Sequence, residues 1–314
     1  MVGTLPGEAF LNEFWLDPTL RELLEPQLQF NNLIPTTDAT ERAVIYDQIN
    51  NTAAKDIENG VMSLPMPAGE ESGLTKLKMT NISELKGKIP KIGYSFELSR
   101  DLLENKAKTE NWLNTCIKKA AYGISYMVNS LTLDRIQKGR SNPTTPSITW
   151  GSDTGKQNPI EDLINSWYDY KQKGYANRAY FQYFNTINHK ELVQYLTNRE
   201  IEFQYEDANT ITIPGVASLK NRKFIDVEDQ YPEGSYATLD LSPTVDPGIA
   251  MWRYIDPEFA VEQPSPDGNG TQYTGVHINT SRMDKNPFTT TVEMWLNILP
   301  VLTNKDVVMN SNGI

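Results

Sequence analysis

Apolar and polar side chains alternate most clearly over residues 91–98. The apolar positions on one side of this segment are Ile92, Tyr94, Phe96 and Leu98. A period of two residues predicts a strand with one buried face. Ser99 follows and predicts the start of a short helix, because a serine hydroxyl can accept a hydrogen bond from a free amide in the first turn.

A longer segment, residues 109–139, has the period of an α-helix. Thr109 is the predicted N-terminal cap, and Gly139 ends the segment, as glycine often does. The apolar positions recur every three or four residues, at Trp112, Cys116, Ala120, Ile124, Met127 and Leu131, with Ile117, Val128 and Ile136 widening the stripe. About thirty residues at ~1.5 Å each predict a rod roughly 45 Å long.

The second half of the chain predicts mixed α/β structure. Asn158, Pro159 and Glu161 form a helix start, residues 180–184 an aromatic strand, and residues 188–191 the start of another helix that includes His189. Short strands are expected at 211–213, 224–227, 236–241 and 249–254, and a long one at 288–302. Helix, strand and helix indicate an α/β layer, and the rest of this half is rich in strands.

The N-terminal part predicts little regular structure. Residues 1–35 are expected to run as an arm with at most one helical stretch, and residues 40–50 as a strand with Ala43, Ile45 and Ile49 on one face. Residues 1–75 contain twelve acidic and three basic side chains. The lysines that follow in a predicted loop are Lys76, Lys78, Lys86 and Lys88. An acidic arm and a basic loop could pair within or between chains, but lysines that only protect strand edges explain the loop equally well.

Composition narrows the function. The chain has 314 residues, 39% of them hydrophobic and 22% charged, which is ordinary for a globular protein. A net charge of −11 argues against tight binding of nucleic acid. No apolar run approaches the ~20 residues that span a bilayer, so no membrane is expected as a partner. The single cysteine, Cys116, cannot form an internal disulfide, and its place in the helical stripe predicts a packing role.

No segment carries convincing catalytic chemistry. Two histidines and one cysteine have no metal-binding spacing, and Gly151–Lys156 lacks the spacing and hydroxyl of a phosphate loop. We therefore expect no catalytic, cofactor or metal site. An alternative is a carbohydrate-active enzyme, with Asp226, Glu228 and Asp229 as carboxylates and aromatic residues such as Trp252 and Tyr254 as a sugar platform.

Two short patterns carry a resemblance to a known family. Residues 92–103 read IGYSFELSRDLL, and the long helix then ends with DRIQKG at 134–139. This order resembles the major capsid proteins of tailed double-stranded DNA viruses, which have the Hong Kong 97-type fold. There a strand with Ser-x-x-Leu-Leu precedes the spine helix, and Asp-x-x-Ile-x-x-Gly closes it. The resemblance implies an α+β fold with an N-arm, an extended loop, a spine helix and an axial domain.

The resemblance also implies boundaries and partners. The implied parts are the N-arm and first peripheral strand (1–60), the extended E-loop (61–95), the peripheral P-domain with the spine helix (96–157), the axial A-domain (158–274) and the returning P-domain strand (275–314). Identical subunits would form pentamers and hexamers of an icosahedral virion shell around DNA, after synthesis in the host cytoplasm. Separate scaffolding, portal and decoration proteins are further partners of such shells. An encapsulin-type cellular compartment of the same fold is the alternative.

Overall fold

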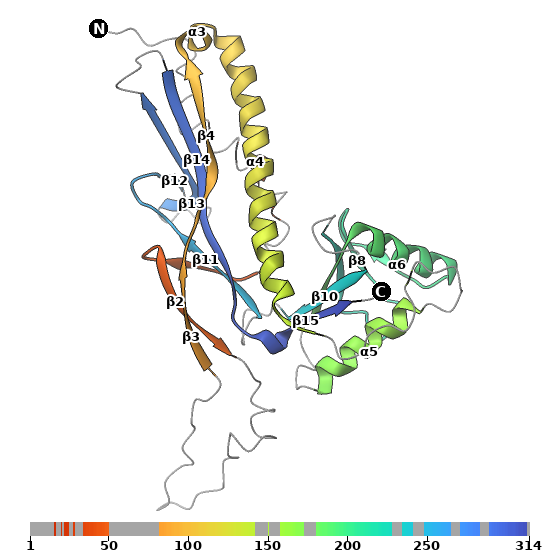
Figure 1. Cartoon of the computed structure of the whole chain (residues 1–314). Coiled ribbons are helices and arrows are strands. Elements are labelled where there is room, and N and C mark those ends of the chain that lie inside the picture. Colours follow the sequence, from red (N-terminus) through yellow and green to blue (C-terminus); the bar gives the residue numbers. More distant parts are fainter. Residues whose placement is uncertain are drawn as a thin grey trace, which may run out of the picture. The chain divides into compact units, whose positions relative to one another are not determined.

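The computed structural model divides the chain into two compact units. The first comprises residues 1–44, 87–132 and 251–300, and the second comprises 45–86, 133–250 and 301–314 (Figure 1). The structure describes residues 34–49, 82–141, 150, 158–172, 180–227, 234–240, 248–264, 271–282 and 289–312, together with 16, 20, 22–24 and 28. Four of these N-terminal residues are buried leucines at a spacing of four: Leu16, Leu20, Leu24 and Leu28.

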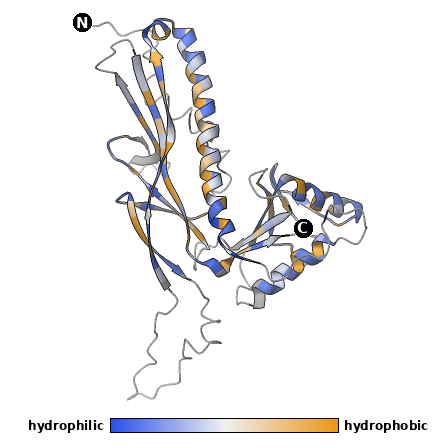
Figure 2. Cartoon of the chain, in the orientation of Figure 1, coloured by the Kyte–Doolittle hydropathy of each residue, from blue (hydrophilic) through white to orange (hydrophobic). Residues whose placement is uncertain are grey.

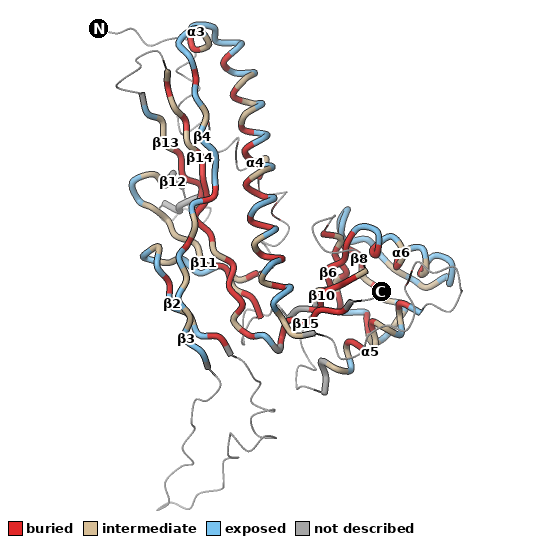
Figure 3. The backbone as a smooth tube through the Cα atoms, in the orientation of Figure 1, coloured by how far each residue is buried: buried red, intermediate tan, exposed pale blue. Residues whose placement is uncertain are grey.

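A six-stranded sheet belongs mainly to the first unit. Its strands are β1 (Thr36–Ala39), β4 (Lys91–Ser99), β11 (Ile249–Tyr254), β12 (Ala260–Pro264), β13 (Thr271–Arg282) and β14 (Thr289–Leu302). The order is β1-β11-β14-β13-β12, and β4 also pairs with β14. The β4–β14 ladder is antiparallel, from Ser99 opposite Thr289 to Lys91 opposite Asn297. Strand β14 has neighbours on both sides, and most of its side chains are buried (Figure 3).

Two helices follow β4. Helix α3 (Arg100–Leu103) is capped by Ser99, whose hydroxyl accepts a hydrogen bond from the Leu102 amide, as predicted. Helix α4 (Lys106–Gln137) is the predicted long helix. Hydrophilic and hydrophobic residues are interspersed along it (Figure 2). Phe96 of β4 contacts Trp112 of α4 edge to face, with ring centroids 5.5 Å apart.

A seven-stranded sheet belongs to the second unit. Its order is β5-β15-β10-β6-β9-β8-β7. The elements are β5 (Arg140–Ser141), α5 (Pro159–Gln172), β6 (Tyr180–Phe184), α6 (Thr186–Asn198), β7 (Gln204–Tyr205), β8 (Thr210–Thr212), β9 (Lys223–Asp226), β10 (Ser235–Asp240), the 3-10 helix η4 (Lys305–Val307) and β15 (Val308–Asn312). Its core contains Trp150, Phe184 and Tyr236, with ring centroids 5.4 to 5.8 Å apart. The predicted capping box is confirmed: Asn158 Oδ1 accepts from the Glu161 amide, and Asn158 Nδ2 donates to Glu161 Oε2.

Strands β2 (Ala43–Ile49) and β3 (Ile82–Lys88) form a separate two-stranded sheet. Ala43 and Ile45 share one face of β2, as predicted, and this face is the exposed one. Ala43 is exposed, Ile45 is 59% exposed, and Val44 and Gln48 are buried instead. Burial of Gln48 is possible because its side-chain amide donates to the Leu302 carbonyl at 2.8 Å.

Four expectations for the helices need correction. Helix α4 begins before Thr109, because the Asn105 side chain caps it by accepting from the Lys108 amide. Met127 is exposed and Cys116 is half-buried, so the buried face of α4 is rotated from the predicted stripe. Its buried face contains Leu113, Ile117, Ala120, Ala121, Ile124, Val128, Leu133 and Ile136. The helix predicted to start at residues 188–191 begins earlier, as α6, with Asn185 as its cap, and its His189 is buried.

Candidate assembly surfaces

The predicted contact lysines are only partly within the described residues. Lys86 and Lys88 are exposed on β3 and, two residues apart, point to the same side of the strand. Lys76 and Lys78 lie outside the described residues. Their proposed partner, the acidic arm, is also mostly outside them, so its pairing with the lysines stays a prediction.

The end of the β2–β3 sheet is fixed by Arg42, which precedes β2. The Arg42 carbonyl accepts from the Ile89 amide, just after β3, at 2.8 Å. Its guanidinium lies over the Tyr254 ring, 5.4 Å from the centroid, and 3.4 Å from an Asp256 carboxylate oxygen. Arg42 and Ile89 flank the base of the β2–β3 sheet. These contacts hold the two residues against the turn that follows β11.

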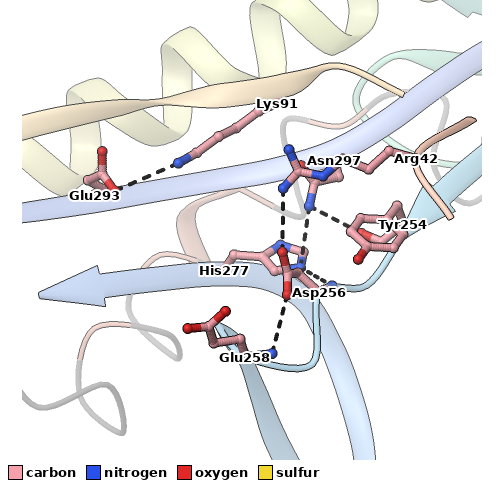
Figure 4. A network of polar contacts seen from close by, with 8 residues as sticks. All are labelled: Arg42, Lys91, Tyr254, Asp256, Glu258, His277, Glu293 and Asn297. Atoms are coloured by element: carbon pink, nitrogen blue, oxygen red, sulfur yellow. Dashed lines mark hydrogen bonds and ion pairs between the residues drawn. The ribbon is translucent and has the colours of Figure 1, made fainter. Parts of the chain in front are cut away.

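That turn is held in place by a buried histidine (Figure 4). The Asp256 amide donates to Nε2 of His277 at 2.8 Å, and Asn297 Nδ2 lies 3.4 Å from the same nitrogen and 3.3 Å from the Tyr254 carbonyl. The imidazole also stacks on Trp295, with centroids 5.4 Å apart and 13° between the rings. Because Nε2 accepts a hydrogen bond from the backbone, the ring is held as neutral imidazole.

The charge state of His277 follows from its surroundings. Burial lowers the pKa of His277 to about 4, since a charged ring would lose its hydration. The Trp295 backbone and Asp256 oppose this shift in the pKa, whereas the cations Arg42 and Lys91 reinforce it. A neutral, fully buried ring tied into three strands stabilises the sheet and is poorly placed for acid–base catalysis.

A groove lined largely by apolar and aromatic side chains lies between β4 and α4. It has a volume of about 880 Å³. Its exposed side chains are Tyr94, Tyr122, Tyr126 and Met127, which are 50%, 63%, 51% and 46% exposed. Tyr122 and Tyr126 stack one helical turn apart, with centroids 6.3 Å apart. This surface was not predicted from the sequence, because Met127 was placed in the buried stripe of the long helix.

The groove's floor depends on a glycine of α4. A side chain at Gly123 would meet the Tyr94 hydroxyl and lie 2.7 Å from ring carbon Cζ. The absence of a side chain at Gly123 therefore lets the Tyr94 ring lie across the helix. Similar surfaces of exposed tyrosine and methionine commonly mark contact sites for other proteins.

Of the residues considered for sugar chemistry, Asp226 belongs to the second unit and Trp252 and Tyr254 to the first. Asp226 accepts a hydrogen bond from the Thr186 hydroxyl at 2.8 Å, and Glu228 and Asp229 lie outside the described residues. Trp252 and Tyr254 are half-buried, and Tyr254 is covered by Arg42. Within the ranges given above, no three His, Cys, Asp or Glu side chains gather as a metal site would require.

None of the described helices is both long and apolar enough to cross a membrane.

The similarity of this chain to known proteins lies in its structure and not in its sequence. No family model matches the sequence, and no curated protein matches it either. Among solved structures, the virus-like particle from Pyrococcus furiosus has a TM-score of 0.54 and 10% identity, over 96% of this chain and 100% of that one. The capsid of the native GTA particle has a TM-score of 0.57 and 9% identity, over 91% and 90%.

A cellular shell protein is similar to the same extent. The SrpI encapsulin from Synechococcus elongatus has a TM-score of 0.52 and 12% identity, over 100% of this chain and 92% of that one. At such identities the likeness concerns the fold, and it runs over nearly the whole of each chain. The protein therefore has the Hong Kong 97-like α+β fold that residues 92–139 suggested.

Proposed function

We propose that this chain is a structural subunit whose identical copies form pentamers and hexamers of a closed icosahedral shell around double-stranded DNA. The observation that carries the proposal is the match of the whole fold to subunits of three kinds of shell particle. Closed symmetry repeats each interface many times, so individually weak contacts add up to a stable particle. We assign no catalytic role to the chain.

The charge of the chain suits enclosure of DNA rather than tight binding. A net charge of −11 repels phosphate, so a packaged polymer would not adhere to the wall through the protein's overall field. In this proposal the subunit is made in the host cytoplasm and ends in the virion. Scaffolding, portal and decoration proteins are its further partners.

A second candidate is the shell of a cellular compartment that encloses an enzyme instead of a genome. The encapsulin match favours it, because that match covers all of this chain. The two candidates differ in content and not in fold.

Negative-stain microscopy of the purified protein tests both candidates. Closed particles that contain nucleic acid by absorbance support the viral capsid, and particles with a co-purifying enzyme support the compartment. A chain that stays monomeric by light scattering under all assembly conditions contradicts both.

The exposed lysines of β3 give a first mutational prediction. The double variant Lys86→Glu, Lys88→Glu should weaken each contact between subunits about tenfold, which corresponds to 1.4 kcal/mol, and thereby lower the assembled fraction. Its subunit should fold normally, with a thermal midpoint within about 2 °C of the parent, because exposed substitutions change stability little. Assembly is measured by sedimentation.

The matched control is Lys190→Glu, Lys220→Glu, which changes the net charge equally at two exposed lysines of the second unit. If the control impairs assembly as much as the β3 variant, net charge and not the β3 surface is responsible. Normal shells from the β3 variant would remove these lysines from the interface.

A further inference from the structure

The groove between β4 and α4, the β4–α4 groove, is positively charged in a chain that is acidic overall. Its basic lining residues are Lys91, Lys118 and Lys119, and no acidic residue lines it. Lys91 is already engaged, since its ammonium lies 3.6 Å from the Trp295 ring centroid and 3.7 Å from a Glu293 carboxylate oxygen. Lys118 and Lys119 are exposed, and no ion pair joins either of them to the parts of the chain that the structure describes. Two cations can therefore meet an anionic ligand in the groove.

The segment of α4 that lines the groove carries no carboxylate. Residues 111–132 contain no aspartate or glutamate, although the chain has 40 acidic residues. At ~1.5 Å per residue this acid-free segment is about 33 Å long. Asn111 and Ser130 are exposed on it, seven residues before Lys118 and four residues after Tyr126, and so lie along the same face of the helix. Their side chains, like those of lysine and tyrosine, can donate hydrogen bonds, and the face suits an elongated anion.

Aromatic rings lie beside the two lysines. Tyr122 and Tyr126 are 63% and 51% exposed, and their rings stack with centroids 6.3 Å apart and 29° between the planes. Tyr122 is one helical turn from Lys118 and Lys119, so the rings and the ammonium groups share one face of α4. Proteins that hold single-stranded nucleic acid combine these two features, since cations neutralise the phosphates and aromatic faces stack on unpaired bases.

The net charge of −11 is compatible with such a local contact. At 0.1 M salt the Debye length is about 10 Å, so exposed carboxylates farther than this from the groove are largely screened. Glu293, which lies close to the groove, is paired with Lys91. The overall charge still weakens binding, and we expect a dissociation constant on the order of 10⁻⁵ M at physiological salt.

We propose that the β4–α4 groove binds a short stretch of single-stranded nucleic acid, with Lys118 and Lys119 on its phosphates and the exposed tyrosines stacked on unpaired bases. The groove volume of about 880 Å³ is typical of a ligand site and not of the seat of a folded domain. A protein partner fits the groove less well, because lysine is depleted at the centre of protein interfaces. This binding activity goes beyond the proposed shell and does not depend on it.

Binding of a fluorescein-labelled oligothymidylate of about 20 nucleotides to unassembled full-length subunits tests the site. Lys118→Ala, Lys119→Ala should weaken binding about tenfold and reduce the slope of log K against log[salt] by about 1.4, because two phosphate contacts are lost. Tyr122→Leu should also weaken binding about tenfold but leave the slope unchanged, since it removes a stacking ring and no charge. The duplex of the same oligonucleotide should bind more weakly, because its bases are paired.

The matched controls lie in the second unit. Lys190→Ala, Lys220→Ala removes the same charge, and Tyr168→Leu removes a similarly exposed tyrosine of α5. Each control should change the affinity less than about twofold, and all variants should keep a thermal midpoint within about 2 °C of the parent. An equal loss in the two lysine variants would overturn the site, because overall charge would then explain binding. Equal affinity for duplex and single strand, or unchanged affinity in Tyr122→Leu, would overturn the stacking.

Photocrosslinking locates the contact without any substitution. An oligothymidylate that carries 5-iodouracil forms adducts with aromatic side chains on which the base stacks, and we expect the adduct in the tryptic peptide 120–135, which contains Tyr122 and Tyr126. Adducts confined to other peptides would overturn the groove as the site. An eight-residue peptide that alternates glutamate and tryptophan serves as a competitor. If it binds the parent more tightly than the oligonucleotide does, and loses this binding in the Lys118→Ala, Lys119→Ala variant, the occupant is a protein and the proposal fails. None of these measurements requires shells, so failure of the proposed assembly leaves them decisive.

Discussion

Replacing Gly93 by alanine should lower the free energy of unfolding of the first unit by about 3–4 kcal/mol. A Cβ at Gly93 would meet the Met294 carbonyl oxygen and lie 2.6 Å from the Trp295 Cα. Both are backbone atoms of β14, paired with β4 on one side and β13 on the other, so they cannot move without breaking ladder hydrogen bonds. Urea unfolding followed by circular dichroism measures the change, and a shift of a few tenths of a kcal/mol would show that β4 adapts.

Gly123→Ala is the matched control, because its obstacle is a side chain. The atoms nearest to a Cβ at Gly123 belong to the half-exposed Tyr94 ring, which can swing outward. Alanine also favours a helix interior over glycine by about 0.5–1 kcal/mol. We expect unchanged or slightly higher stability for this variant. An equal loss of stability in Gly93→Ala and Gly123→Ala would contradict our premise that a new Cβ is tolerated against a side chain but not against backbone atoms.

The elements that the sequence predicted best have local signals. The capping box at Asn158 and the serine cap at Ser99 act within a few residues of the chain, and α4 is long enough for its period to be unmistakable. The face of α4 was predicted less well, because the helix carries apolar residues on two sides. One side contains Ile117 and Ile124 and is buried, and the other contains Met127 and two tyrosines and lines the groove. Periodicity alone cannot tell which stripe faces the core.

Strand β13 and its polar network could not be predicted from sequence. Residues 271–282 are rich in threonine and other polar residues, and only pairing with β12 and β14 makes them a strand and buries His277. The buried face of β2 could not be predicted for a similar reason, since Gln48 is buried through a partner 254 positions away. Lys86 and Lys88 are exposed on β3, and their role as contacts between subunits stays a prediction.

Acidification should weaken the sheet around His277. The pKa of this histidine is about 6.5 when the chain is unfolded and falls to about 4 in the folded protein. Between these values the unfolded chain binds a proton that the folded chain does not, so stability decreases as the pH falls from 6.5 to 4. The full loss is about 3 kcal/mol, because each pKa unit corresponds to 1.36 kcal/mol. Above pH 6.5 this group contributes no pH dependence.

Protonation of His277 should first weaken the contacts at the base of the β2–β3 sheet. A protonated Nε2 can no longer accept from the Asp256 amide, and Asp256 is the residue that contacts Arg42, whose carbonyl holds the Ile89 amide. The protection factor of the Ile89 amide in hydrogen exchange, which is corrected for the intrinsic slowing of exchange at lower pH, should therefore fall between pH 6.5 and 4. His277→Gln keeps a hydrogen-bond acceptor for the Asp256 amide but does not titrate. Between pH 6.5 and 4 this variant should therefore lose about 3 kcal/mol less stability than the parent. His189→Gln, which removes the buried histidine of the second unit, is the control and should leave the response of the Ile89 amide to pH unchanged. If His277→Gln and the parent lose equal stability in acid, His277 is not the cause of the acid sensitivity.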